Sequence, residues 1–314
     1  MRIKHILTAA AFAFAVTAGH HHALAAPGKG PSIDALGVAL AKPAAPLGAR
    51  SKAAASGAAG PAATARRFGL KFSPAKDLRK IPPARATRAQ RPATFNLLRY
   101  TPGIVNQGNQ SSCVGFATTY AALTIIESVK QGQPQPPFSP SYTYNRGMVL
   151  DSLADGETPS CDRGMMIETA LGLLQGFGAQ PVDAFPYSEL ECVPLPGYYL
   201  DESARQFRIA GWARAQNRED ILQSIARGVP VVFGIDVPQS FLDYKGGIYE
   251  DDVSPGVGGH AMTIVGYDDN YRVYLVMNSW GPEWGDHGYA WIKYETLERR
   301  LVIDGVVRAF VIFP

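Results

Sequence analysis

Cys113 stands at the start of a segment whose apolar spacing predicts one long, largely buried helix. Residues 107–132 read QGNQSSCVGFATTYAALTIIESVKQG, and apolar residues cover most of the helix circumference after the cysteine. We expect Ser111 or Ser112 to cap the start and Gly132 to end the helix. Unpaired N–H groups and the helix dipole stabilise an anion there, so the pKa of the Cys113 thiol should be lowered and its thiolate could act as a nucleophile. The alternative is a buried structural thiol, which is the more common fate of a single cysteine.

A nucleophilic cysteine needs a base that takes its proton and returns it to the leaving group. Beyond residue 22 the chain has two histidines, His260 and His287. His260 follows Gly258 and Gly259 and opens the apolar stretch AMTIVGY, so a strand end should hold its ring beside open space. His287 lies in the polar turn WGDHGY, where an exposed residue needs no function. The sequence therefore favours His260 as the base.

Asn278 is the candidate for orienting the ring of His260. It ends a predicted strand at 271–279, and a hairpin with the predicted strand at 260–268 would bring the two side chains together. A neutral amide can hold one tautomer of the ring without drawing charge from a thiolate–imidazolium pair. Trp280 comes two residues later and is expected to shield this contact from water, although a core aromatic is its plainer interpretation.

The charge that develops on an attacked carbonyl oxygen needs hydrogen-bond donors. The backbone N–H of Cys113 is one such donor. The side-chain amide of Gln107, six residues earlier, is the candidate for the second. Taken alone, Gln107 would be an ordinary loop residue.

The first 25 residues have the pattern of a secretory signal. Two basic residues precede an apolar run at 6–18, which is too short to span a bilayer as a mature helix, and a small-x-small site predicts cleavage after Ala25. Cleavage would remove the three histidines at 20–22, so we expect no metal site and no cofactor. No later segment is long and apolar enough for a membrane span. The protein is therefore expected to be exported, to a periplasm or outside the cell.

Export favours oxidised thiols, and an odd number of cysteines leaves one over. The economical assignment pairs Cys161 with Cys192 and leaves Cys113 free for chemistry. This pairing is a hypothesis that intact and reduced mass spectra of the folded protein would test.

Residues 26–91, called the arm below, are rich in Ala, Pro, Gly and Arg and should not fold by themselves. Residues 27–100 hold 14 Lys and Arg against 2 Asp and Glu, a net of +12, whereas residues 101–314 hold 14 against 25, a net of −11. A basic arm could bind nucleic acid or anionic lipid. In an exported protein we instead expect it to lie on its own acidic domain as a pro-segment, with a solvated linker as the alternative, and we expect no nucleic-acid partner.

Two halves of different pattern follow the arm. Residues 92–205 are mainly helical, with helices expected near 139–145 and 165–177, and they carry Cys113. Residues 206–314 are β-rich and carry His260 and Asn278. The β-rich half opens with a helix that Asn217 caps, and its predicted strands span 230–237, 260–268, 271–279, 288–295 and 306–313. The predicted fold class is α+β, with a helical domain followed by an antiparallel, barrel-like β domain.

Together these pieces resemble the papain-like cysteine peptidases, in that family's order along the chain. The resemblance covers about residues 92–314, and Cys113 precedes His260 by 147 residues, within the family's spacing. The matching pieces are Asn106-Gln107-Gly108 with Cys113, Cys161-Asp162-Arg163-Gly164, Phe185-Pro186-Tyr187, Gly246-Gly247-Ile248-Tyr249, Gly259-His260-Ala261 with Val265-Gly266-Tyr267, and Asn278-Ser279-Trp280-Gly281 with Trp284-Gly285 and Gly288-Tyr289.

The resemblance implies two domains that meet at a cleft, with the cysteine on one wall and the histidine on the other. It also implies hydrolysis of peptide or protein substrates through an acyl-enzyme. The implied roles are oxyanion donor for Gln107, nucleophile for Cys113, acid and base for His260, orienting residue for Asn278, and backbone contact to an extended substrate for Gly164. We therefore expect an exported cysteine endopeptidase.

The sequence departs from the family pattern around the cysteine. Ser111 replaces a glycine and Val114 a tryptophan. Gln110 stands where the family often has a disulfide cysteine, which supports the pairing of Cys161 with Cys192. The arm lacks the helical pattern usual for the family's pro-segments.

Two alternative functions keep the fold. One is a cell-wall amidase or peptide transferase, although short wall amidases usually lack the Asn-Ser-Trp-Gly run at 278–281. The other is a catalytically silent binding module, although such proteins typically lose the cysteine, the histidine or the glutamine, and all three are present here.

Overall fold

The computed structural model describes residues 31–37, 40, 66–85, 89–251 and 253–314. The predicted signal segment, its cleavage site, the histidines at 20–22 and much of the arm lie outside the described residues. Within the described part, no helix is long and apolar enough to cross a membrane.

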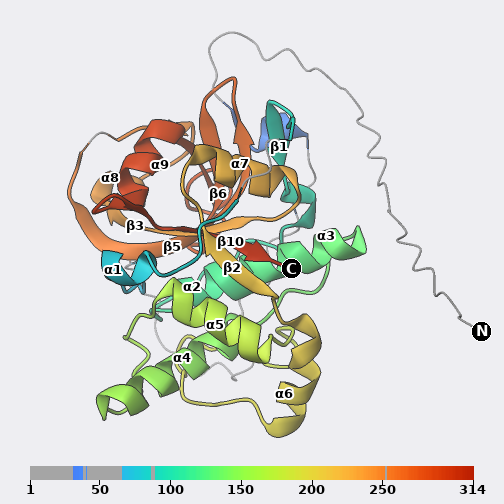
Figure 1. The fold of residues 1–314 in the computed structure, drawn as a ribbon, viewed down its shortest axis with the longest axis vertical. Helices are drawn as coiled ribbons and strands as arrows, with labels where there is room; N and C mark the ends of the chain where they lie inside the picture. Colours follow the sequence, from blue (N-terminus) through green and yellow to red (C-terminus); the bar gives the residue numbers. More distant parts are fainter. Residues whose placement is uncertain (1–30, 38–39, 41–65, 86–88, 252) are drawn as a thin grey trace, which may run out of the picture.

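A sheet with eight strands, counted over the described residues, frames the β-rich half (Figure 1). Its order is β2-β10-β3-β5-β6-β7-β4, with β1 paired to β5, and its pairs are antiparallel except for β4 with β7. The strands are β1 (Thr94–Asn96), β2 (Gly211–Arg214), β3 (Val231–Pro238), β4 (Ile248–Tyr249), β5 (Gly256–Asp268), β6 (Val273–Met277), β7 (Tyr289–Lys293) and β10 (Ala309–Phe313), while β8 (Val302–Ile303) and β9 (Val306–Val307) form a separate hairpin.

Helices α4, α5 and α6 gather at the end of the molecule away from most of the sheet, and α2 and α3 lie between them and the strands (Figure 1). The helices are α1 (Ala75–Leu78), α2 (Cys113–Gly115), the π-helical η3 (Phe116–Leu123), α3 (Thr124–Gln131), α4 (Pro140–Asp155), α5 (Ile167–Phe177), α6 (Tyr198–Ala204), α7 (Arg218–Ala226), α8 (Gln239–Leu242) and α9 (Tyr294–Leu301). Short 3-10 turns lie at η1 (Asp34–Leu36), η2 (Leu98–Tyr100) and η4 (Arg205–Phe207).

Two buried hydrophobic clusters hold these halves together. One consists mainly of sheet residues and large aromatic side chains such as Trp284 and Tyr274. The other consists mainly of helix residues such as Leu171 and Tyr144 and includes Cys113. The α+β fold class predicted from the sequence is confirmed.

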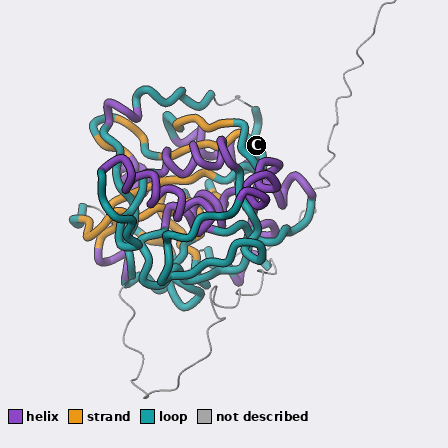
Figure 2. The backbone as a smooth tube through the Cα atoms, turned by 90° about the horizontal axis from the view of Figure 1, so that it is seen from below, coloured by secondary structure: helices purple, strands orange, loops and turns teal. Residues whose placement is uncertain are grey.

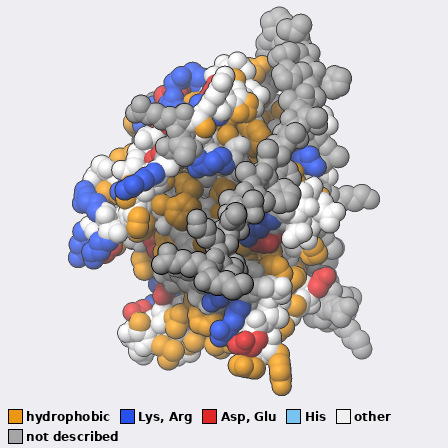
Figure 3. All heavy atoms as spheres, turned by 45° about the vertical axis from the view of Figure 1, so that its right-hand side comes forward, with side chains coloured by type: hydrophobic (Ala, Val, Ile, Leu, Met, Phe, Trp, Pro, Cys, Tyr) orange, Lys and Arg blue, Asp and Glu red, His pale blue; other side chains and the backbone are white. Residues whose placement is uncertain are grey.

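The surface is formed largely by loops and helix faces. Long loop segments run over much of the outside of the molecule (Figure 2). On the face drawn in Figure 3, Lys and Arg side chains lie in separate groups with hydrophobic side chains between them.

The hairpin that was predicted to carry the base and its orienting amide is present. β5 and β6 pair antiparallel, with Thr263 opposite Met277. Because His260 lies three residues before Thr263 and Asn278 directly follows Met277, the pairing brings both to the same end of the sheet. β5 begins at Gly256, earlier than expected, because its first residues pair with β3 as far as Pro238.

The helix that follows Cys113 differs in detail from the prediction. It continues without a break to Gln131 and ends at Gly132, which has a φ of 70°, as expected. Its middle is π-helical rather than α-helical, and the side chain of Ser112 makes no capping hydrogen bond. Ser112 occupies the N-cap position, as expected, but its hydroxyl contacts the hydroxyl of Tyr187 at 2.9 Å instead of a backbone N–H of the helix.

Candidate active site

Cys113 is placed at the start of α2 and has no solvent-exposed surface. Backbone N–H groups, including those of Ala261 and Gly69, act on its sulfur and favour the thiolate, but burial outweighs them and raises the pKa of the thiol to about 12. The expectation of a lowered pKa at the helix start is therefore wrong for the chain in this closed state. The physical reason is desolvation, to which part of the arm contributes.

His260 lies on β5 directly before Ala261, whose backbone N–H acts on the Cys113 sulfur. Its Nε2 lies 2.8 Å from Oδ1 of Asn278. That oxygen also accepts the backbone N–H of Ser279 at 2.8 Å, so Nε2 of the ring carries the hydrogen and donates it. Nδ1 is therefore an acceptor, and it has no hydrogen-bond partner among the described residues. Burial lowers the pKa of His260 to about 4, so the ring is neutral at pH 7.

Trp280 covers the imidazole ring of His260. The two rings stack with centroids 4.3 Å apart and planes inclined by 21°. Asn278 is only 5% exposed beneath them. The structure thus places the indole where the sequence analysis expected a shield against water.

Gln107 is fully buried, and its side-chain amide is held at both ends. The Ser279 hydroxyl donates to its Oε1 at 2.7 Å, and its Nε2 donates to the backbone oxygen of Gln110 at 2.9 Å. The Tyr187 hydroxyl donates to its backbone oxygen at 2.7 Å. Sequence reasoning missed Ser279 and Tyr187, although both lie inside the quoted motifs and the position of Ser279 beside Asn278 was the available signal.

Part of the arm lies across these groups. We call residues 66–72 the cleft segment. The ring of Phe68 meets those of His260 and Trp280 edge-on, with centroids 6.4 and 6.3 Å away. The backbone N–H of Leu70 donates to Gly259 at 3.1 Å. The backbone oxygen of Arg67 lies 3.5 Å from Nε2 of Gln107, at the edge of hydrogen-bond distance.

Gly164 lies under the cleft segment. A Cβ atom at this position would come within 2.3 Å of the backbone oxygen of Gly69. Next to it, Met165 accepts from the N–H of Lys71 at 3.0 Å and donates to the oxygen of Gly69 at 2.9 Å, as in a parallel bridge. The backbone beside Gly164 is therefore able to pair with an extended chain.

Cys161 and Cys192 form a disulfide, and Cys113 is the free cysteine of the described chain. The backbone oxygen of Cys161 accepts the N–H of Ser111 at 3.1 Å, which ties the disulfide to the loop before Cys113. His287 lies away from this cluster, half exposed in its turn and 3.4 Å from Asp34.

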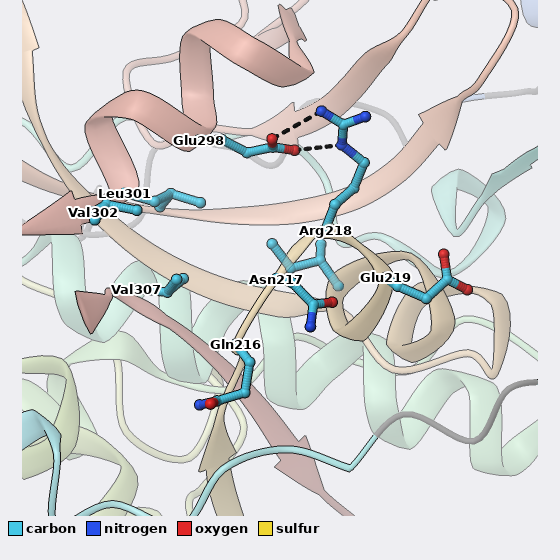
Figure 4. A pocket seen from close by; sticks show the side chains of 9 residues that line it. Gln216, Asn217, Arg218, Glu219, Glu298, Leu301, Val302 and Val307 are labelled. Carbon is cyan, nitrogen blue, oxygen red and sulfur yellow. Dashed lines mark hydrogen bonds and ion pairs between the residues drawn. The ribbon is translucent and has the colours of Figure 1, made fainter. Parts of the chain in front are cut away.

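An open cavity lies away from these groups. It has a volume of about 540 Å³ and lies beside α7 and α9, where Arg218 pairs with Glu298 (Figure 4). None of its lining residues belongs to the motifs described above. The described residues contain no cluster of His, Cys, Asp or Glu that could hold a metal ion.

The site combines a buried thiol at a helix start, a neutral imidazole held by an amide, and a second, fixed amide. Cysteine-dependent hydrolases use groups of these types as nucleophile, base and oxyanion donor. The profile of the papain family of cysteine proteases matches residues 97–304, more than half of the chain. The chain belongs to this family.

Two curated relatives and one solved structure illustrate the likeness. An uncharacterized peptidase C1-like protein of Acanthamoeba polyphaga mimivirus is 28% identical over 212 residues, covering 61% of this chain and 64% of that protein. A cathepsin L-like proteinase of Fasciola hepatica is 26% identical over 203 residues, covering 60% and 56%. The chain thus spans less than two thirds of the length of either relative. The crystal structure of xylellain, a cysteine protease from Xylella fastidiosa, shares the fold with a TM-score of 0.66 at 23% identity, over 79% of this chain and 97% of that one.

Proposed function

We propose that this protein is an exported endopeptidase in which Cys113 attacks the peptide carbonyl and His260 moves the proton. The observation that carries the proposal is the contact of Nε2 of His260 with Asn278 at 2.8 Å, which leaves Nδ1 as an acceptor on a strand beside the thiol. An orienting amide on one ring nitrogen is useful when the other nitrogen works as a base.

The proposed reaction has two steps. The Cys113 sulfur bonds to the carbonyl carbon while its proton passes to Nδ1 of His260, and the proton then goes to the leaving amine as the C–N bond breaks. Water next attacks the thioester, giving a proton to His260, and the C–S bond breaks to regenerate the thiol. The oxyanion of each step is stabilised by the backbone N–H of Cys113 and by Nε2 of Gln107.

We also propose that the arm is a pro-segment that docks on the acidic catalytic domain. The contacts of the cleft segment with His260, Trp280 and Gly259 support this, because a substrate needs the same space. Ion pairs between arm and domain add charge complementarity, among them those of Arg67 with Asp162, Lys71 with Asp151, and Arg91 with Asp269. Gly164, beside the paired backbone of Met165, is proposed to line the path of an extended substrate once the arm has left.

Export is supported by two features. One is the secretory pattern of the first 25 residues, and the other is the disulfide between Cys161 and Cys192, which persists in oxidising compartments. N-terminal sequencing of the protein recovered from outside the cytoplasm would test it, and a mature N-terminus that retains residues 1–25 would contradict it.

An epoxide inactivator of papain-type peptidases tests the chemistry. We expect a single adduct on Cys113, located by peptide mass spectrometry, and its loss in His260→Ala. His287→Ala serves as the matched control and should label like the wild type. A folded protein with a reduced Cys113 that gives no adduct after removal of the arm would contradict the proposal and favour a silent binding module. Cleavage of muropeptides in place of peptide libraries would favour a wall amidase.

A further inference from the structure

Next to the catalytic groups, the cleft segment fills a pocket whose floor carries a buried cation. The domain side of the pocket is formed by Ile167, Glu168, Gly234, Arg308 and Phe310. The arm side is formed chiefly by Leu70 and Phe72, and the space left between the two sides is only about 10 Å³.

The pocket adjoins the site of bond cleavage. The backbone of Gly69, the residue before Leu70, acts on the Cys113 sulfur. Leu70 itself donates its N–H to Gly259, the residue before His260. A side chain in this pocket therefore belongs to a residue close to the bond that is cut.

Gly234 makes the pocket deep. A Cβ atom at this position would lie 2.3 Å from the Leu70 side chain and 3.3 Å from that of Ile167. Any larger residue would close the space that Leu70 occupies. The depth allows a substrate side chain to reach the floor.

Arg308 forms that floor and is 5% exposed. Its Nη2 donates to the backbone oxygen of Arg300 at 2.6 Å, and its Nε to that of Leu301 at 3.4 Å. Its Nη1 has no hydrogen-bond partner among the described residues. The carboxylate that acts on it is that of Asp236, which is not within hydrogen-bond distance of it in the described part of the chain. Burial lowers the pKa of Arg308 to about 10, so it stays charged at pH 7 but is poorly solvated.

Phe72 of the arm covers this cation. The Arg308 guanidinium carbon lies 4.2 Å from the centre of the Phe72 ring, and Phe72 is itself 37% exposed. Departure of the cleft segment would uncover the guanidinium, whose Nη1 has no hydrogen-bond partner among the described residues and is free to donate to an anionic ligand in the pocket.

We propose that, in the activated enzyme, Arg308 makes this pocket select a substrate residue with an acidic side chain. The inference rests on the proposed peptidase function and deepens it by naming the substrate class. The carboxylate of a substrate Glu or Asp would accept from Nη1, in the place where the Phe72 ring lies in the closed state.

Glu168 is the other ionisable group on the domain side of the pocket, and it argues for the opposite preference. Burial raises the pKa of its carboxyl group, and Ser73 of the arm donates a hydrogen bond to it. As a residue Glu168 is partly exposed, whereas Arg308 is buried. Glu168→Gln is accordingly the matched control for Arg308 variants.

The main test uses the full chain, activated by limited trypsin cleavage in its Arg-rich arm, and a peptide library varied on both sides of the cut. We expect peptides with Glu at one position to be cleaved with a kcat/KM roughly 10- to 100-fold above their Gln counterparts. Arg308→Met should bring the ratio near one, Arg308→Lys should retain part of it, and Glu168→Gln should raise it rather than lower it, because that change removes a carboxylate from the pocket. A ratio near one in the wild type, or a preference for Lys and Arg that Glu168→Gln removes, would overturn the proposal.

A second test needs no peptidase activity. In the full chain, Phe72→Glu should place a carboxylate beside Arg308 and raise the urea midpoint of unfolding above that of Phe72→Gln. The difference should vanish in the Arg308→Met background, as in a double-mutant cycle. Equal midpoints for the Glu and Gln variants would overturn the assignment of Arg308. Failure to cleave any peptide would instead count against the proposed function. The unfolding measurement would still show whether Arg308 binds a carboxylate in the pocket.

Discussion

At the scale of single residues, burial determines the protonation of the two groups proposed to do the chemistry. It raises the pKa of Cys113 and lowers that of His260, so both are neutral at pH 7 while the cleft segment is in place. Sequence reasoning identified both residues from their neighbours, but it judged the cysteine from the helix dipole alone. A helix dipole stabilises a thiolate by about 1 kcal/mol or less, whereas full burial of a charge costs several. The predicted direction of the pKa shift of Cys113 was therefore wrong.

The buried His260 predicts a loss of stability in acid. Its pKa is about 4 in the folded chain against 6.5 when unperturbed, so between these values the unfolded state binds more protons. Stability should fall as the pH decreases from about 6.5 to about 4, by about 3 kcal/mol in total from this group. Urea unfolding of the full chain and of His260→Gln at several pH values measures the difference. Parallel losses in both proteins would show that other groups are responsible.

The hydrogen bond from His260 to Asn278 predicts a positioning role for the amide. In Asn278→Ala the ring loses its partner and can adopt unproductive orientations, so kcat should fall roughly 10- to 100-fold with little change in KM. Asn270→Ala, an exposed asparagine in the turn of the same hairpin, is the control and should behave like the wild type. A fall confined to KM would assign Asn278 to substrate binding instead.

At the scale of elements, patterns with strong periodicity were predictable. The expected strands beginning near 230, 260, 271 and 288 correspond to β3, β5, β6 and β7 because each is a run of apolar, β-branched or aromatic residues. The short strands β1 and β2 and the helices α6 and α9 were missed, whereas β4 lies in the stretch 246–249 that the family resemblance marked as a strand and turn. The missed elements have few residues, and their positions depend on partners far away in the chain, such as β5 for β1.

The disulfide between Cys161 and Cys192 ties two loops of the helical half. It closes a segment with a sequence separation of 31, for which chain entropy gives a stabilisation of about 3 to 4 kcal/mol. The double variant Cys161→Ser and Cys192→Ser should lose about this amount in urea unfolding. The backbone oxygen of Cys161 also accepts the N–H of Ser111, in the loop before Cys113. With the arm removed from both proteins, epoxide labelling of Cys113 should therefore be slower in the double variant than in the wild type. Unchanged stability would show that the bond adds nothing to the folded state.

At the scale of the whole molecule, the opposite charges of arm and domain predicted an association but not where it occurs. The ion pair of Arg67 with Asp162 is largely exposed at both ends and contributes little. The contacts that specify the position of the cleft segment are backbone pairing with Gly259 and Met165 and the packing of Phe68. Such contacts leave no periodic signal in a sequence, which is why Ala, Pro and Gly content alone suggested a linker as readily as a pro-segment.

Gly69 offers the sharpest test of the arm as an inhibitor. A Cβ atom at this position would come within 2.0 Å of the backbone oxygen of Ser111, which is too close for any rearrangement of a side chain to relieve. In the full chain, Gly69→Ala should therefore displace the cleft segment and speed epoxide labelling of Cys113 by roughly tenfold or more, since 1.4 kcal/mol of lost docking already gives that factor.

Lys76→Ala, an exposed position in the same arm, is the matched control and should label at the wild-type rate. Arg67→Ala should speed labelling far less than Gly69→Ala, because an exposed ion pair is weak compared with a backbone collision. Equal rates for Gly69→Ala and the wild type, with Cys113 reduced in both, would mean that the cleft segment does not limit access to the thiol. In that case the arm would act as a linker.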